Sequence, residues 1–188
     1  YHPYDDLPKM INPTSGYIFN TNNSPFNSTA EFENLKEEDY NSTFSFMEEE
    51  NNRSIRFMEL IDEYEKLSYE DFKEIKYDQQ YPDSILYIGN ISQIFDLDKS
   101  EFPNYENLID LIQKWDRRGD IENIGAAQWS LYYSYMLDVL SENDLNVKDT
   151  IDIKFHLDAL EKTKARLMNN FGKLDICLLY TSPSPRDR

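Results

Sequence analysis

The clearest pattern along the chain is a helical repeat of large side chains that begins near residue 50. Positions three and four apart lie on one face of a helix, so the repeat predicts an amphipathic helix. The positions are Arg53, Phe57, Leu60, Ile61 and Tyr64. A second helix is predicted from Ser68 to about Tyr77, because Ser68 and Asp71 have the spacing of a capping box.

Further helices are predicted after a turn around Pro82. A short helical run covers residues 84–95, and the apolar positions of the next helix are Tyr105, Leu108, Ile109, Ile112 and Trp115. Residues 125–140 are apolar around most of the helix, so we expect this helix to be largely buried. A last helix is predicted over residues 147–170, with Gly172 as its C-terminal stop.

The first 50 residues carry a different pattern. Three prolines in residues 1–15 exclude a regular helix and predict an extended lead-in. The aromatic and β-branched content of residues 16–22 predicts one strand, which Asn23-Ser24-Pro25 ends. Asn, Ser, Thr and Glu dominate the following stretch and predict an irregular loop with room for one short helix. The predicted parts are residues 1–25, the loop 26–50 and a helical region 51–176.

Residues 177–188 differ in character from the acidic helical pattern before them. From Cys177 to Asp187 they match, codon for codon, the translation of a transposon-type sequencing adapter. We therefore expect this tail to be read-through rather than natural protein. On this interpretation the natural segment runs from Tyr1 to about Ile176, and both of its ends are cuts.

Composition and charge narrow the function classes. The chain has 188 residues with 36 acidic and 19 basic side chains, a formal charge of −17. Apolar and aromatic residues recur throughout, which indicates a globular acidic protein rather than a disordered tail. An acidic surface repels phosphate, so we expect no nucleic-acid partner and no binding to anionic membranes. The chain has no apolar stretch long enough to span a bilayer, and its single cysteine excludes an internal disulfide framework.

The usual catalytic motifs are absent from the sequence. The two histidines, His2 and His156, have no Cys or His at ligand spacing, and we interpret them as surface or core residues. The sequence contains no Gly-rich phosphate loop, no Gly-x-Ser-x-Gly motif and no Cys/His pair. A metal centre or a familiar nucleophile within this chain is therefore not predicted.

Two polar positions remain candidates for chemistry. On the predicted strand, Asn20 and Asn22 share a face with Ile18, which would place amide N–H donors where an oxyanion could be stabilised. The alternative is an ordinary turn, because Asn, Ser and Pro are turn residues. Arg53 lies on the apolar stripe of its helix and there needs a carboxylate or amide partner. Its alternative is to extend into solvent at the helix end.

The segment Asn12-Pro-Thr-Ser-Gly-Tyr-Ile-Phe-Asn-Thr-Asn-Asn-Ser-Pro25 resembles a segment of the β chain in the penicillin acylase family. That family includes penicillin amidases, acyl-homoserine-lactone acylases and cephalosporin acylases. Further similar segments follow in the family's order, at residues 52–61 with 67–72 and at residues 111–116 with Gly125-Ala-Ala127. The resemblance covers most of residues 1–140.

The resemblance implies an α+β fold: a fragment of an αββα N-terminal-nucleophile hydrolase, with one or two core strands followed by a mostly helical region. In this family the precursor cuts itself, and the new N-terminal Ser of the β chain attacks an N-acyl amide of penicillin or acyl-homoserine-lactone type, with its own α-amino group as base. The family's oxyanion-hole Asn falls on Asn22, and its active-site Arg falls on Arg53. No cofactor is required, and the protein partner is the upstream part of the same precursor.

The resemblance also predicts the activity, metal binding and location of the chain, and one alternative function remains open. The nucleophilic Ser lies upstream of the Asn22 motif in the family, so we expect this chain alone to be inactive. Family members can bind calcium through an acidic residue after the motif, where Glu33 is the candidate. The family is usually exported, which implies a periplasmic or secreted location. The rival is a non-enzymatic acidic helical binding module, in which residues 20–25 are only a turn.

Overall fold

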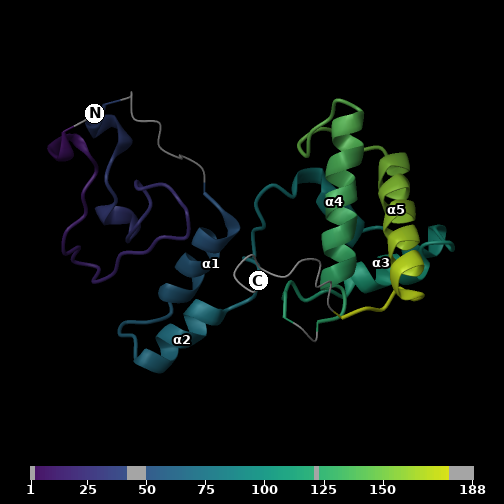
Figure 1. Ribbon diagram of the computed structural model, residues 1–188, viewed down its shortest axis with the longest axis horizontal. Helices are drawn as coiled ribbons and strands as arrows, with labels where there is room; N and C mark the ends of the chain where they lie inside the picture. The colour runs from purple at the N-terminus through teal and green to yellow at the C-terminus, as the bar shows by residue number, and fades with distance from the viewer. Residues whose placement is uncertain (1–2, 42–49, 121–122, 178–188) are drawn as a thin grey trace. The chain divides into compact units, whose positions relative to one another are not determined.

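The computed structural model describes residues 3–41, 50–120 and 123–177, which fall into two compact units (Figure 1). We call residues Tyr1–Asp78 with Pro82–Ser84 the N-terminal unit, and Gln79–Tyr81 with Ile85–Arg188 the helical unit. His2, residues 42–49 of the predicted loop and residues 178–188 of the suspected adapter tail lie outside the described residues.

The N-terminal unit consists of irregular chain followed by two helices. Its 3₁₀ turns are η1 (Tyr4–Asp6), η2 (Glu31–Glu33) and η3 (Glu37–Asp39), and its helices are α1 (Asn52–Ile61) and α2 (Tyr69–Tyr77). The buried ring of Phe19 stacks on Phe57 of α1 with 4.4 Å between ring centroids, and Tyr17 meets the same ring edge-on at 6.1 Å. These aromatic contacts hold residues 17–19 against α1.

The strand predicted over residues 16–22 does not form in the structure. The described residues contain an isolated bridge between Gln80 and Arg118 but no strand. In the predicted segment, the N–H of Phe19 donates to the Ser28 carbonyl at 2.9 Å, and a left-handed φ of 63° at Asn22 breaks the alternation of side chains. A strand needs a ladder of hydrogen bonds to a neighbour, and one backbone bond is not a ladder. The predicted α+β core is therefore not present among the described residues, whereas the predicted helical region is.

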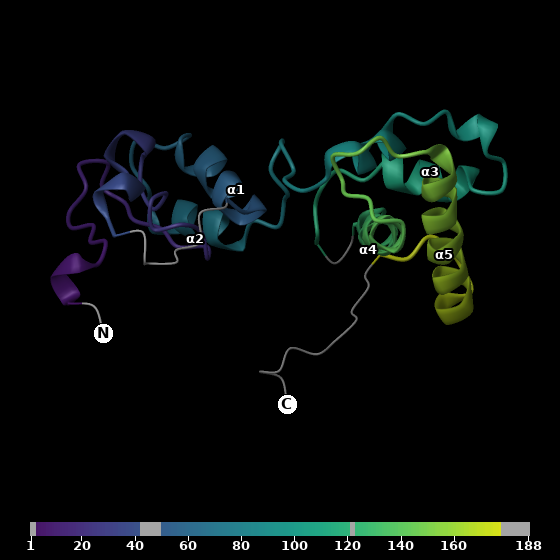
Figure 2. The same ribbon diagram turned by 90° about the horizontal axis from the view of Figure 1, so that it is seen from above.

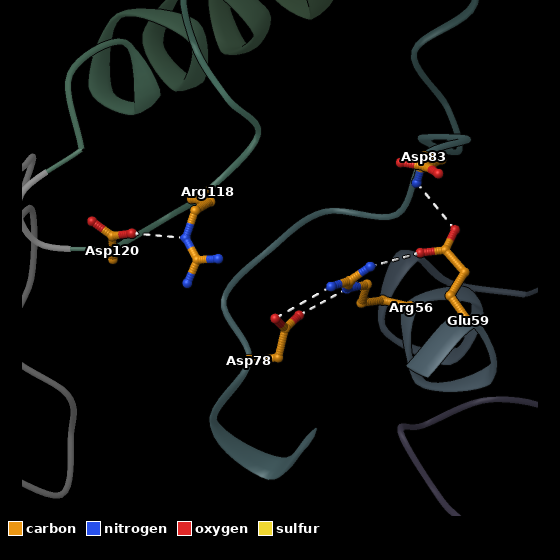
Figure 3. A network of polar contacts seen from close by, with 6 residues as sticks. All are labelled: Arg56, Glu59, Asp78, Asp83, Arg118 and Asp120. Atoms are coloured by element: carbon orange, nitrogen blue, oxygen red, sulfur yellow. Dashed lines mark hydrogen bonds and ion pairs between the residues drawn. The ribbon is translucent and has the colours of Figure 1, made fainter. Parts of the chain in front are cut away.

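The helices α1 and α2 begin and end close to their predicted bounds. The capping box predicted for α2 is present: the Ser68 hydroxyl accepts the Asp71 N–H at 3.2 Å, and the Asp71 carboxylate accepts the Ser68 N–H at 2.8 Å. Arg56 of α1 donates to Asp78 at 2.9 Å and to Glu59 at 3.1 Å (Figure 3). The pair with Asp78 fastens α1 to the residue that follows α2.

The described part of the helical unit contains three α-helices and two 3₁₀ segments. They are η4 (Gly89–Phe95), η5 (Lys99–Glu101), α3 (Glu106–Gln113), α4 (Ala126–Glu142) and α5 (Ile153–Phe171). Helix α5 lies beside α4 in both views (Figures 1 and 2). The run predicted at 84–95 is a 3₁₀ helix that begins at Gly89, and Gly172 ends α5 with a left-handed φ of 69° as expected.

The last helix begins later than predicted. The prediction was residue 147, but α5 begins at Ile153. The cause is local hydrogen bonding: the Asp149 carboxylate accepts the Asn146 N–H at 2.8 Å, and the Asp152 carboxylate caps the helix by accepting the Lys154 N–H at 2.9 Å. Side chains of this kind compete with the helical backbone and fix the helix start.

The core of the helical unit is built on stacked tryptophans. Trp115, which follows α3, and Trp129 of α4 stack with 5.5 Å between their rings. Helix α4 is less buried than predicted: it buries one face, which includes Trp129, Tyr132 and Met136, whereas Leu137 on the other side is 41% exposed. Gly125, at φ 108°, permits this packing, because a Cβ there would lie 2.8 Å from the Trp115 Cβ. None of the helices among the described residues is long and apolar enough to cross a membrane.

Candidate functional site

The structure brings two of the predicted site residues together. The Nη2 of Arg53 donates a hydrogen bond to the Asn22 Oδ1 at 3.0 Å, although 31 positions separate them in the sequence. Both residues are exposed. The partner of Arg53 is thus an amide carbonyl, one of the two partner types that its donor fork suits. We call this pair, with the backbone that holds it, the candidate site.

A tight turn presents the side chain of Asn22. The Asn20 Oδ1 accepts the Asn22 N–H at 2.8 Å, which is an Asx turn, and the Asn23 Oδ1 accepts both the N–H and the hydroxyl of Thr21 at 2.7 and 2.9 Å. Asn tolerates the left-handed conformation that Asn22 adopts better than most residues do. In the sequence, this turn is an alternative to a functional role. In the structure, the turn itself presents the Asn22 side chain to Arg53.

The first turn of α1 presents Arg53. The Asn51 Oδ1 caps the helix by accepting the N–H groups of Arg53 and Ser54, each at 3.0 Å. This position places the Arg53 side chain on the exposed side of the helix start. Both alternatives for Arg53 hold in part: its side chain is exposed at the helix start, and it also has an amide partner, Asn22.

The contact with Arg53 decides which way the Asn22 amide faces. A guanidinium has only donors, so Asn22 must turn its Oδ1 toward Arg53, and its Nδ2 then faces away. This Nδ2 makes no hydrogen bond to any residue in the described part of the chain. Both of its N–H groups are therefore available to an oxygen atom of a ligand.

A second layer of polar contacts supports the site. The fully buried hydroxyl of Ser54 accepts the Asn51 N–H at 3.1 Å and donates to the Glu50 carboxylate at 2.5 Å. The other oxygen of Glu50 accepts from the Asn27 amide, and the Asn27 carbonyl accepts from the Asn23 amide. The network links the turn at residues 20–23 to α1. Asn51 and Glu50 were not predicted, although an Asn followed three positions later by Ser is a recognisable cap signal.

Glu33, the third predicted site residue, is engaged elsewhere. Its carboxylate accepts the N–H of Thr14 at 2.5 Å, the Thr14 hydroxyl, and the N–H of Ser15 at 2.8 Å. The Thr14 hydroxyl bond is the main cause that lowers the pKa of Glu33 to about 2. Within residues 3–41, 50–120 and 123–177, no group of three His, Cys, Asp or Glu side chains could hold a metal ion. These bonds occupy the Glu33 oxygens, and calcium binding by Glu33 stays a prediction.

His156 lies in the core of the helical unit, as one of the alternatives for it predicted. Its Nδ1 lies 2.5 Å from the Tyr132 hydroxyl, and burial lowers the pKa of its imidazole. A hollow of about 590 Å³ also lies in this unit, and its lining includes Tyr87, Tyr133 and Leu145. No predicted site residue contributes to that hollow.

The family model described as penicillin amidase matches residues 1–178. No solved structure matches the chain.

Proposed function

The chain belongs to the penicillin amidase family, and on that premise we propose that it contributes the oxyanion-binding part of an amidohydrolase active site. The family supports an acylase-type hydrolase as the parent activity. The finer proposal is that the parent cleaves N-acyl amides, of penicillin or acyl-homoserine-lactone type, through an acyl-enzyme. The observation that carries it is the Arg53–Asn22 hydrogen bond.

The proposed role of Asn22 follows from the direction of its amide. When a nucleophile adds to an amide carbonyl, negative charge develops on the carbonyl oxygen, and a fixed N–H donor stabilises that charge more than it stabilises the substrate. Arg53 occupies the Oδ1 and keeps the amide from rotating. The Nδ2 of Asn22 therefore donates to the oxyanion, and Arg53 is a positioning residue that acts through Asn22.

The proposed reaction takes its nucleophile from outside this chain. By resemblance, an N-terminal Ser that precedes the Asn22 motif forms the bond to the substrate carbonyl carbon, and its α-amino group accepts the hydroxyl proton. The amine leaves with a proton when the tetrahedral intermediate collapses, and water then releases the acid. We accordingly propose that this chain is inactive without the upstream part of its precursor, and that the parent works in the periplasm or outside the cell.

The test is Asn22→Ala in the complete protein that contains this sequence. We expect kcat on an N-acyl amide to fall about 10²- to 10³-fold, the usual cost of one oxyanion donor, while self-cleavage of the precursor stays normal. Asn90→Ala in the helical unit is the matched control for amide removal. Wild-type turnover in Asn22→Ala with complete self-cleavage would refute the oxyanion role of Asn22. No hydrolysis of N-acyl amides by the complete wild-type protein would favour the non-enzymatic binding module.

A further inference from the structure

One side chain joins the two halves of the candidate site. The Asn51 Oδ1 caps α1 at the N–H groups of Arg53 and Ser54, while its Nδ2 donates to the Thr21 carbonyl at 3.1 Å. Thr21 immediately precedes Asn22, so its carbonyl belongs to the peptide group that carries the Asn22 N–H. A single amide therefore ties the helix start that bears Arg53 to the turn that bears Asn22.

We propose that Asn51 is a positioning residue that sets the contact between Arg53 and Asn22, an inference that rests on the proposed function. A helix cap alone does not need asparagine, because Asp and Ser cap equally well. The Thr21 carbonyl, however, needs a donor, and of these three side chains only Asn has an acceptor for the helix and an N–H that reaches the turn. The second bond is what distinguishes this cap from one that only begins a helix.

The surroundings of Asn51 hold its side chain in one orientation. Its own N–H donates to the Ser54 hydroxyl at 3.1 Å, and Ser54 is fully buried and also bonded to Glu50. Its Oδ1 faces two N–H donors, so its Nδ2 must face the Thr21 carbonyl. Catalytic geometry is sensitive to such placement: a shift of about 1 Å in a site can cost about 10²-fold in rate.

Two variants separate the cap from the positioning bond. Asn51→Asp keeps the cap but replaces the donor by an oxygen that repels the Thr21 carbonyl. Asn51→Ser keeps the cap without a charge and is too short to reach Thr21. Asn52→Asp is the matched control, because it adds the same charge one residue along and leaves Asn51 intact. In all three, amide hydrogen exchange of α1 checks that the helix still forms.

The first measurement needs no enzymatic activity. In ¹⁵N NMR spectra of this chain, the Arg53→Leu variant shows the chemical shift of the Asn22 side-chain amide when the Arg53–Asn22 hydrogen bond is broken. We expect Asn51→Asp and Asn51→Ser to move the Asn22 side-chain signal to that position, and Asn52→Asp to leave it unchanged. Wild-type signal positions in both Asn51 variants, or the same shift in Asn52→Asp, would overturn the proposal.

The second measurement is made in the complete protein. We expect both Asn51 variants to lower kcat about 10- to 100-fold with KM changed less than about 2-fold, because the oxyanion donor is displaced rather than lost. A rate loss without movement of the Asn22 signal contradicts positioning through Asn22. If the signal moves as expected but the wild-type protein hydrolyses no N-acyl amide, the role of Asn51 stands and the proposed function fails.

Discussion

At the scale of single residues, one contact underlies the roles that we propose for Asn22 and Arg53. Each was ambiguous in the sequence: the asparagine fits a turn and the arginine fits a solvated helix end. The hydrogen bond between them orients the amide, because the guanidinium can only donate. The turn and the solvent exposure both exist, and they are the means by which the pair is presented rather than alternatives to it.

The variant Arg53→Leu tests whether Arg53 orients the Asn22 amide. Without the donor, the Asn22 amide is free to rotate, and we expect kcat of the complete protein to fall about 10-fold or more. Stability should change by less than about 0.5 kcal/mol, because Arg53 is exposed. The measurement combines steady-state kinetics with a urea unfolding curve. Arg53→Lys keeps a donor and should recover part of the rate; full activity in Arg53→Leu would make Arg53 an ordinary surface cation.

Glu33 supports a second residue-scale prediction, on pH. The Thr14 hydroxyl and nearby N–H groups hold its pKa at about 2, below the ordinary 4.5. A carboxyl whose folded-state pKa is lowered stabilises the fold at pH above its ordinary value, and this contribution is lost as the pH falls from about 4.5 toward 2. A ¹³C NMR titration of the Glu33 carboxyl should show the low pKa, and Thr14→Val should raise it. An ordinary pKa in both proteins would contradict the contact.

At the scale of elements, the helices and the strand were decided by different interactions. The capping box at Ser68 and Asp71 and the stop at Gly172 are local, so their sequence signals placed α2 and the end of α5 correctly. The strand predicted at residues 16–22 depends on a pairing neighbour, and none is present among the described residues. Hydrogen bonds from the Phe19 N–H to the Ser28 carbonyl and from the Thr29 hydroxyl to the Tyr17 carbonyl hold this segment instead. Hydrogen bonds between residues close in sequence can be predicted from the local sequence. The pairing of a strand with a distant segment cannot.

Gly125→Ala tests the packing of α4 on the end of α3. A Cβ at Gly125 would lie 2.7 Å from the Leu111 carbonyl oxygen and 2.8 Å from the Trp115 Cβ, at a φ of 108°. We expect a loss of about 3 kcal/mol in the free energy of unfolding, from strain and overpacking together. Chemical denaturation of the chain measures it. Gly172→Ala, at a φ of 69° in open space, should lose only about 1 kcal/mol; equal losses would show that the close contact costs nothing.

At the scale of the whole molecule, the acidic charge acts on both units. The chain carries a formal charge of −17, and each unit contains ion pairs, such as Arg56–Asp78 in the N-terminal unit and Arg118–Asp120 in the helical unit (Figure 3). The Arg56–Asp78 pair is partly buried and is screened little by salt, whereas the more exposed pairs contribute little to stability. The repulsion among the excess carboxylates should therefore dominate the response to salt.

Added salt should therefore raise the melting temperature. Raising the NaCl concentration from 0.01 to 0.1 M shortens the screening length from about 30 to about 10 Å and weakens repulsion among surface carboxylates. We expect an increase of a few degrees by differential scanning calorimetry at pH 7. Choline chloride at the same ionic strength should give the same increase, since screening does not depend on the cation. A fall with salt would mean that the ion pairs outweigh the repulsion.

The sequence by itself determined most of the helices, the capping box of α2, the stop of α5 and the family, because hydrophobic periodicity, these capping signals and the residue 12–25 motif are encoded locally. It also singled out Asn22 and Arg53. Only the tertiary structure decided that these two side chains meet, which way the Asn22 amide faces, and that Asn51 joins them. Contacts between residues 31 positions apart depend on how the chain folds back, and a linear pattern does not contain that information.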